Sequence, residues 1–87
     1  MSPLDWAVRR DNIALAKFLI SAGADVDSKD GWGRSSLLWA VSLGNKALAE
    51  LLISAGANVN AKDFLGRSPL DYANSKEMKE LLQGVKP

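Results

Sequence analysis

The sequence predicts an all-α solenoid of helix-turn-helix units that are joined by β-turn or hairpin loops. The first observation behind this prediction is an internal repeat of 33 residues, since "KDGWGRS" at 29–35 recurs as "KDFLGRS" at 62–68. Residues 2–30 also align without a gap on residues 35–63, and 18 of these 29 positions are identical. Within each unit, the start and stop signals of two short helices follow one another.

The first helix of a unit is predicted to begin at the motif "SPLD", which occurs at 2–5 and at 68–71. Serine is a preferred N-cap, proline fits the first helical position, and aspartate at the third position can complete a capping box. We expect these helices to be short, and to end near Arg9, Ser42 and Ser75.

The second helix is predicted over residues 12–22 and again over residues 45–55. A glycine follows each segment, at Gly23 and Gly56, and glycine readily adopts the left-handed conformation that ends a helix. Apolar side chains recur at i, i+3 and i+4, which predicts one buried face. These side chains are Leu15, Phe18, Leu19, Leu48, Leu51 and Leu52.

The turn that opens each full unit is predicted from Asp30 and Gly33, and from Asp63 and Gly66 in the next copy. Aspartate at the first position and glycine at the fourth are preferred in a type I turn. Such a turn accepts most residues at its two central positions. The residues that occupy those positions are therefore free to serve another purpose.

A single domain is predicted over residues 1–87, near the lower size limit for a chain that folds without disulfides or metals. Its units are a partial first repeat at 2–29, a second at 30–62, and a third at 63–87 that forms the C-terminal cap. The third unit has lost three residues and has a charged second helix, as the end of a repeat array requires.

The first unit lacks a preceding turn, so part of its second helix is expected to be exposed. We expect this exposure at Ile13, Ala14 and Phe18. Two interpretations remain open: the chain is a fragment of a longer protein, or it is a short array that self-associates through this uncapped N-terminal face.

A 33-residue unit of turn, helix and helix that carries "RSPLDYA" and "LLISAGANVNAKD" resembles the ankyrin repeat. The resemblance covers nearly the whole chain. The family signature T-P-L-H-x-A appears with Ser in place of Thr, and the His position holds Asp5, Leu38 and Asp71. Since Leu38 cannot cap a helix, we expect packing to hold the first helix of the middle unit.

The residues Trp6, Trp39 and Tyr72 share one repeat position. We expect them to form an aromatic column between successive first helices, as part of the packed core rather than as a ligand cage.

The composition excludes several classes of function. The chain has no cysteine and no histidine, which removes thiolate chemistry, the commonest general base and the commonest metal ligand. The net charge of +1 indicates neither a nucleic-acid nor a membrane partner. We therefore expect no enzyme, no cofactor and no metal site, and an intracellular location in the cytoplasm or nucleus, with which the lack of cysteine is compatible.

The resemblance to ankyrin repeats implies a protein-binding module that contacts its partner through a concave face of turn tips and first helices. Carried over by position, the implied contact residues of the first two units are Arg9, Arg10, Lys29, Trp32, Arg34, Ser42 and Leu43. Those of the third unit are Lys62, Phe64, Leu65, Arg67 and Ser75. The basic and the apolar residues among them together suggest a partner that is both acidic and hydrophobic.

Two questions about these residues stay open from the sequence. Trp32, Phe64 and Leu65 either form an apolar patch for a partner or fold over one another and cover the junction between hairpins. The arginines either recognise an acidic segment or are simply solvated beside Asp30 and Asp63. The alternative to a binding module is a structural segment of a larger protein that packs against another domain of its own chain.

Overall fold

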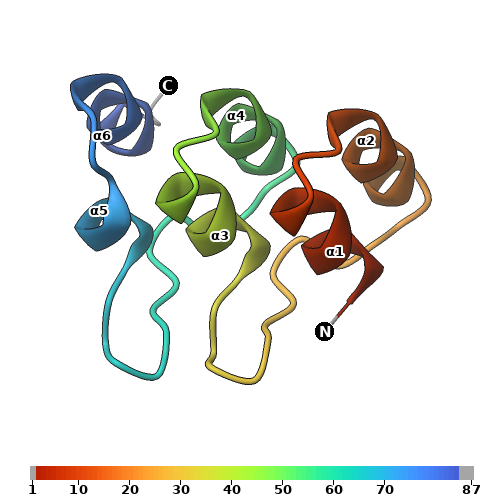
Figure 1. The fold of residues 1–87 in the computed structure, drawn as a ribbon, viewed down its shortest axis with the longest axis horizontal. Coiled ribbons are helices and arrows are strands. Elements are labelled where there is room, and N and C mark those ends of the chain that lie inside the picture. The colour runs from red at the N-terminus through yellow and green to blue at the C-terminus, as the bar shows by residue number, and fades with distance from the viewer. Residues whose placement is uncertain (1, 85–87) are drawn as a thin grey trace.

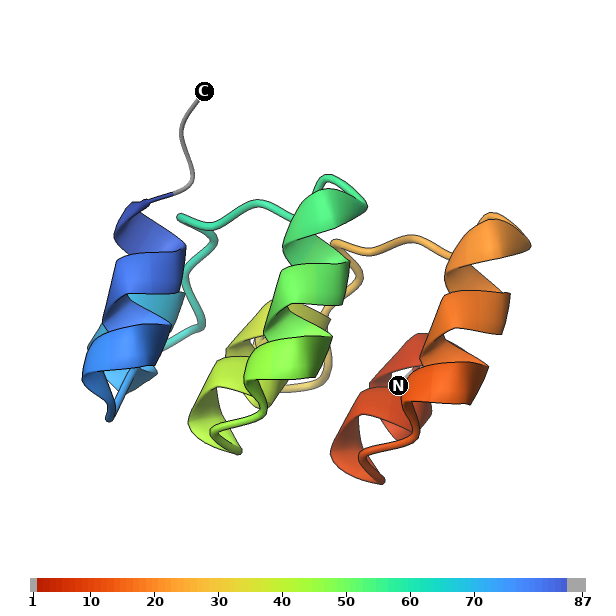
Figure 2. The same cartoon turned by 90° about the horizontal axis from the view of Figure 1, so that it is seen from above.

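The computed structural model describes residues 2–84, and within them the chain forms six helices in three pairs. These are α1 (Pro3–Arg9), α2 (Ile13–Ser21), α3 (Ser36–Ser42), α4 (Lys46–Ser54), α5 (Pro69–Tyr72) and α6 (Lys76–Gln83). The helices α1, α3 and α5 form one layer and α2, α4 and α6 form another, with two long hairpins extending from the first layer (Figure 1). The three pairs follow one another along the array (Figure 2), so the predicted all-α repeat fold is confirmed.

The serine start signals operate as the sequence predicts. The Oγ atom of Ser2 accepts a hydrogen bond from the N–H of Asp5 at 3.2 Å, and the N–H of Ser2 donates to Oδ2 of Asp5 at the same distance. In the middle unit Ser35 caps α3 by accepting from the N–H of Leu38 at 3.2 Å. Each cap satisfies an amide at a helix start that has no partner within the helix.

The third unit departs from the expected helix end. Its first helix, α5, stops at Tyr72 rather than near Ser75, because the three missing residues remove its last turn. The chain becomes extended at Ala73, and the Oγ of Ser75 then accepts a hydrogen bond from the N–H of Met78. Ser75 is therefore the N-cap of α6 and not a residue at the end of the first helix.

The glycines after α2 and α4 end these helices. Gly23 and Gly56 both have φ of 95°, a backbone conformation that residues with a Cβ atom rarely adopt. After α2, the N–H of Ala24 donates to the carbonyl of Leu19 at 3.0 Å, which satisfies a carbonyl that the helix leaves free.

The core lies between the two helix layers and is richest in the middle unit. Five of the seven α3 residues are buried, Leu38 among them, which confirms that packing holds this helix. A polar link adds to the packing, since the Oγ of Ser36 donates to Oδ1 of the buried Asp5 at 2.7 Å. The apolar side chains with the lowest exposure are Leu4, Val8, Ala16, Leu37, Ala40, Val41, Leu48, Ala49 and Leu52.

The outer side of α2 is exposed. Only Ala16 of this helix is buried, Ala14 is exposed, and Phe18 keeps 67% of its surface in solvent. Exposure at this face was expected, but the prediction that Leu15 and Phe18 lie on a buried face is wrong. No element among the described residues covers that side of α2, whereas α4 is flanked by both α2 and α6.

Candidate functional site

Each hairpin is a tight loop that aspartate and glycine define. In the first hairpin the N–H of Asp30 donates to the carbonyl of Arg34 at 2.9 Å, and the N–H of Gly33 donates to the carbonyl of Asp30 at 3.0 Å. Gly33 has φ of 77°, so a type I turn is followed by a left-handed residue, a common hairpin arrangement. The second hairpin repeats these bonds around Asp63 and Gly66, which confirms the predicted turn.

The aspartate side chain holds each hairpin from inside. The Oδ1 atom of Asp30 accepts the N–H groups of Trp32 and Arg34, each at 2.9 Å. Its Oδ2 atom accepts the indole Nε1–H of Trp39, on α3, at 2.8 Å. These bonds fix the hairpin and anchor it to the helix that follows.

Asp63 makes the equivalent contacts in the third unit. Its Oδ1 atom accepts the N–H of Leu65 at 2.9 Å and that of Arg67 at 3.0 Å. Its Oδ2 atom accepts a hydrogen bond from the hydroxyl of Tyr72, on α5. The same clamp therefore occurs twice, with a tryptophan in one unit and a tyrosine in the next.

The clamps favour the ionised form of both aspartates. Burial by itself disfavours the charge on Asp30, but the amides of Arg34 and Trp32 and the indole of Trp39 together hold its pKa below the ordinary value of 3.8. For Asp63 the hydroxyl of Tyr72 has the largest effect, and the amide of Arg67 adds to it, so its pKa is also below 3.8. Both hairpins are thus built around a carboxylate.

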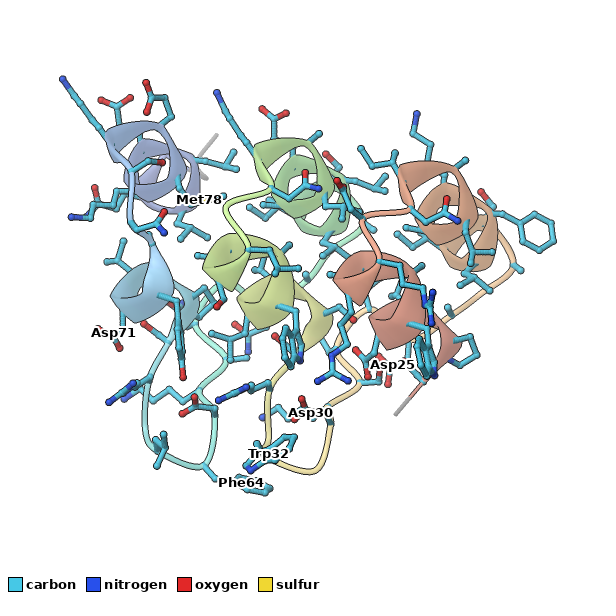
Figure 3. The ribbon with its side chains drawn as sticks, viewed as in Figure 1. Asp25, Asp30, Trp32, Phe64, Asp71 and Met78 are labelled. Atoms are coloured by element: carbon cyan, nitrogen blue, oxygen red, sulfur yellow. The ribbon has the colours of Figure 1, made fainter. Side chains whose placement is uncertain are left out.

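The two hairpins are also bonded to each other. The N–H of Phe64 donates to the carbonyl of Trp32 at 3.0 Å, and Nζ of Lys29 donates to the carbonyl of Lys62 at 3.4 Å. Figure 3 shows the side chains of Trp32 and Phe64 at the neighbouring tips. The ring of Phe64 lies against Gly33, where an added Cβ would come within 2.6 Å of Cε1 of the ring.

The apolar side chains at the tips remain exposed despite this contact. Trp32 keeps 63% of its surface in solvent, Phe64 keeps 76% and Leu65 keeps 70%. The contact between the two hairpins therefore leaves all three side chains mostly exposed, instead of burying them over the junction. We call Trp32, Phe64 and Leu65 the tip patch.

Arginines lie over the aromatic rings beside the tip patch. The guanidinium of Arg9 is 3.9 Å from the centroid of the Trp39 ring, and that of Arg34 is 5.3 Å from the same centroid and 5.5 Å from that of Trp32. Such cation–π contacts are attractive. The guanidinium groups are therefore held on aromatic surfaces instead of extending freely into solvent.

The predicted aromatic column is wrong in part. Trp6 keeps 49% of its surface in solvent, so it is not a core residue, and Arg10 lies 4.7 Å from its ring centroid. Trp39 and Tyr72 are only partly buried, and Arg67 lies 6.0 Å from the centroid of Tyr72. Each of these rings was expected to lie beside the next ring of the column, but an arginine side chain lies beside it instead.

A small cavity of about 50 Å³ lies between α3 and α5. The Nε atom of Arg34 is buried and has no hydrogen-bond partner among residues 2–84. The residues around the cavity are Arg34, Leu38, Trp39, Ser42 and Tyr72. Arg34 and Ser42 were predicted as contact residues, whereas Trp39 and Tyr72 were assigned to the core.

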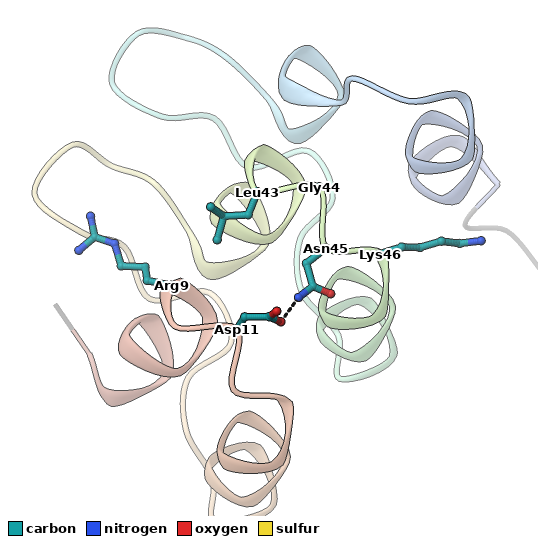
Figure 4. Close-up of a pocket in the computed structure, with 6 residues that line it drawn as sticks. All are labelled: Arg9, Asp11, Leu43, Gly44, Asn45 and Lys46. Carbon is teal, nitrogen blue, oxygen red and sulfur yellow. Dashed lines mark hydrogen bonds between the residues drawn. The ribbon is translucent and has the colours of Figure 1, made fainter.

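A larger and more open pocket of about 480 Å³ lies between the first two units. Asn45 donates a hydrogen bond from Nδ2 to Oδ1 of Asp11, while the side chains of Arg9 and Lys46 point away from each other (Figure 4). Asp11 has φ of 58°, and it occupies the repeat position that Gly44 holds in the next unit. The remaining lining residues are Leu43 and Gly44.

The structure therefore brings most of the predicted contact residues to the hairpins and to the ends of the first helices. Ser75 is the exception, because its hydroxyl caps α6. The sequence analysis did not predict the hydrogen bonds that join Asp30 to Trp39 and Asp63 to Tyr72. The signal was present, because the same spacing of nine residues between an aspartate and an aromatic residue recurs in both units.

The described part of the chain has neither a membrane-spanning helix nor a cluster of metal ligands. None of its helices is long and apolar enough to cross a membrane. Between residues 2 and 84, no three acidic side chains come together in a way that could hold a metal ion.

Three stacked helix pairs with hairpins on one side define a helical repeat protein. A family model for ankyrin repeats in three copies matches residues 2–86, and the chain belongs to this family. The matched repeats are generally protein–protein interaction modules, and no catalytic domain accompanies them in this match. No curated protein matches the chain.

Proposed function

We propose that this chain binds a protein partner through its two hairpins and the adjoining ends of its first helices. The observation that carries the proposal is the tip patch, in which three large apolar side chains stay exposed on a backbone that hydrogen bonds hold in place. Exposed apolar groups beside arginines are typical of interaction sites, and tryptophan and arginine are enriched among residues that dominate binding energy.

The charge of the surface supports a partner that is both apolar and acidic. Arg34 lies beside Trp32, and Arg67 lies in the equivalent position of the third unit. Guanidinium groups held over aromatic rings can still donate hydrogen bonds to carboxylates from their edges. An extended segment with apolar side chains for the tip patch and acidic ones for the arginines matches this arrangement.

A comparison of the wild type with a Trp32→Ala, Phe64→Ala double variant tests the proposal. Both proteins are immobilised, and cell extract is passed over them. A third column carries Phe18→Ala, which removes an aromatic side chain with 67% exposure from α2, in the first unit. Partners retained by the wild type and by Phe18→Ala, but lost from the double variant, support the proposal. An unchanged set of partners on the double variant contradicts it.

A second candidate function is favoured by the exposed side of α2. Phe18 and Leu15 project from this helix with 67% and 40% of their surfaces in solvent, and an open pocket of about 320 Å³ lies between the end of α2 and the start of α1. This side would suit packing against a further domain or a second copy of the chain. Partners lost from the Phe18→Ala column alone would favour this candidate.

A further inference from the structure

The cavity between α3 and α5 has a size that limits what it can hold. Its volume is about 50 Å³, whereas a cavity needs about 10–15 Å³ to hold one water molecule. A group of only a few heavy atoms therefore fits, such as the end of an aspartate or glutamate side chain. The aromatic rings of a partner would have to remain outside, at the tip patch.

Among the side chains that line this cavity, Arg34 is the one that carries a charge, and its guanidinium is a hydrogen-bond donor only. Trp39 directs its indole N–H to Asp30, and Tyr72 directs its hydroxyl to Asp63, so both present ring surfaces without a free donor. The buried Nε–H of Arg34 has no acceptor among the described residues. Burying a donor without a partner is unfavourable, and a carboxylate oxygen would satisfy it.

The neighbouring aspartates do not already serve as that acceptor. Oδ1 of Asp30 accepts two amides and its Oδ2 accepts the indole, while Asp63 accepts two amides and a hydroxyl. The positive charge of Arg34 is close enough to Asp30 and Asp63 to contribute to the lowering of both of their pKa values. Their Oδ1 atoms nevertheless accept hairpin amides and their Oδ2 atoms accept groups on α3 and α5, so each of these oxygens already has a donor.

We infer that this cavity receives the carboxylate of an acidic side chain from a bound protein segment, with Arg34 as its hydrogen-bond donor. The Ser42 hydroxyl lines the same cavity and offers a second donor. A carboxylate brings a negative charge and two acceptor oxygens to these donors, whereas an amide is neutral and has one acceptor oxygen, so glutamine and asparagine should bind more weakly. The inference rests on the proposed function and adds a sequence preference to it.

The location of the cavity links this preference to the tip patch. Arg34 contacts both the Trp39 ring, which lines the cavity, and the Trp32 ring, which belongs to the tip patch. One extended segment can therefore place an acidic side chain in the cavity and an apolar side chain against Trp32.

A displayed library of random peptides of fixed length, selected on the wild-type chain, tests the inference. The expected result is a set of peptides with Asp or Glu at one aligned position beside apolar residues. A selected peptide and its Glu→Gln form are then compared by fluorescence anisotropy, and the Gln form should bind roughly tenfold more weakly or worse. The side-chain Nε–H resonance of Arg34 in a nitrogen-15 spectrum should shift with the Glu peptide and not with the Gln peptide.

Variants identify the residue responsible. Arg34→Gln should bind both peptides equally, whereas Arg67→Gln, at the same repeat position but outside the cavity lining, should keep the discrimination. Ser42→Leu leaves Arg34 intact and narrows the cavity, so it should also lose the preference, even if Arg34→Gln fails to fold. Circular dichroism confirms the helical fold of each variant.

Three results would overturn the inference. Peptides that need Trp32 but show no acidic preference would leave the proposed function standing and remove the acidic pocket. An acidic preference that survives in Arg34→Gln or in Ser42→Leu, or that disappears in Arg67→Gln, would place the acidic contact elsewhere. A selection that yields no peptide binder would contradict both the inference and the proposed function.

Discussion

The indole Nε1–H of Trp39 donates a 2.8 Å hydrogen bond to Oδ2 of Asp30, which lies nine residues earlier in the chain. The next unit forms the same link between Tyr72 and Asp63. Each link joins the first residue of a hairpin to the helix that follows it, so it sets the direction in which the hairpin extends. The tip patch and the arginines depend on that direction for their common location.

Trp39→Phe should destabilise the domain by about 2 kcal/mol, because it keeps an aromatic ring at this position, although a smaller one, and removes a donor to a charged acceptor. Trp6→Phe is the matched control, since Trp6 occupies the same repeat position and is half exposed. Urea unfolding followed by circular dichroism measures both. Equal effects of the two substitutions would show that the link to Asp30 contributes little.

Acid should weaken the fold through both clamps. Asp30 and Asp63 have pKa values below 3.8 in the folded chain, so the unfolded chain binds more protons as the pH approaches that value. Their stabilising effect is complete above the unfolded pKa and is lost as the pH falls from about 4 through the folded pKa values.

Urea midpoints between about pH 7 and about pH 3 measure this effect. Asp30→Asn should lower the midpoint at neutral pH and reduce its dependence on acid. Glu50→Gln, which changes an exposed carboxylate on α4, is the control. A variant with Asn at residue 30 and the acid dependence of the wild type would contradict the assignment.

Gly33→Ala should destabilise the domain more than Gly66→Ala. Both glycines have left-handed φ values, of 77° and 79°, so both substitutions incur the backbone cost of about 1–2 kcal/mol. Only at Gly33 would the new methyl group also displace the ring of Phe64, because an added Cβ at Gly66 has open space around it.

A double-mutant cycle isolates the contact between Gly33 and Phe64. In a Phe64→Ala background, the costs of Gly33→Ala and Gly66→Ala should become equal. If the difference persists without the ring, its cause lies in the backbone of the first hairpin.

Asp5→Ala should cost more stability than Asp71→Ala, although both residues occupy the same repeat position. Asp5 is buried and accepts the hydroxyl of Ser36, which ties α1 to α3, whereas Asp71 is exposed and serves the start of α5 alone. We expect about 3 kcal/mol for Asp5, from a lost cap and an unpaired hydroxyl, and about 1 kcal/mol for Asp71. Thermal unfolding of both variants checks the order.

Self-association through α2 is testable by sedimentation velocity. Phe18→Gln should leave the unfolding midpoint nearly unchanged, because the side chain is mostly exposed. The same substitution should reduce any concentration-dependent rise in the sedimentation coefficient of the wild type. A wild-type chain that sediments as a monomer at every concentration would exclude this role for α2.

The sequence is sufficient to predict the helices and hairpins because their signals are local. Serine caps, left-handed glycines and the Asp-to-Gly turn each depend on residues within four or five positions of one another. Where these residues recur, the same helix starts, helix ends and turns can be predicted in each unit. The prediction that α5 ends near Ser75 is wrong because the deletion makes Ser75 the N-cap of α6, a role that Asn12 and Asn45 have for the second helix of the first two units.

The arrangement of the predicted contact residues is harder to predict because it depends on interactions between separate units. Arg9 lies on α1, yet its guanidinium covers Trp39 on α3, a conformation that depends on the stacking of two helix pairs. Likewise the cavity beside Arg34 exists only where α3 meets α5. The spacing of residues within one unit does not predict which side chains of neighbouring units come into contact.

The bond from the N–H of Phe64 to the carbonyl of Trp32 has a consequence for the thermodynamics of binding. Loops that must become ordered on association lose conformational entropy, and this loss subtracts from affinity. These two tips are joined through backbone atoms before any partner arrives. Under the proposed function, the entropy lost on docking would therefore stay small whichever side chains the two tips carry.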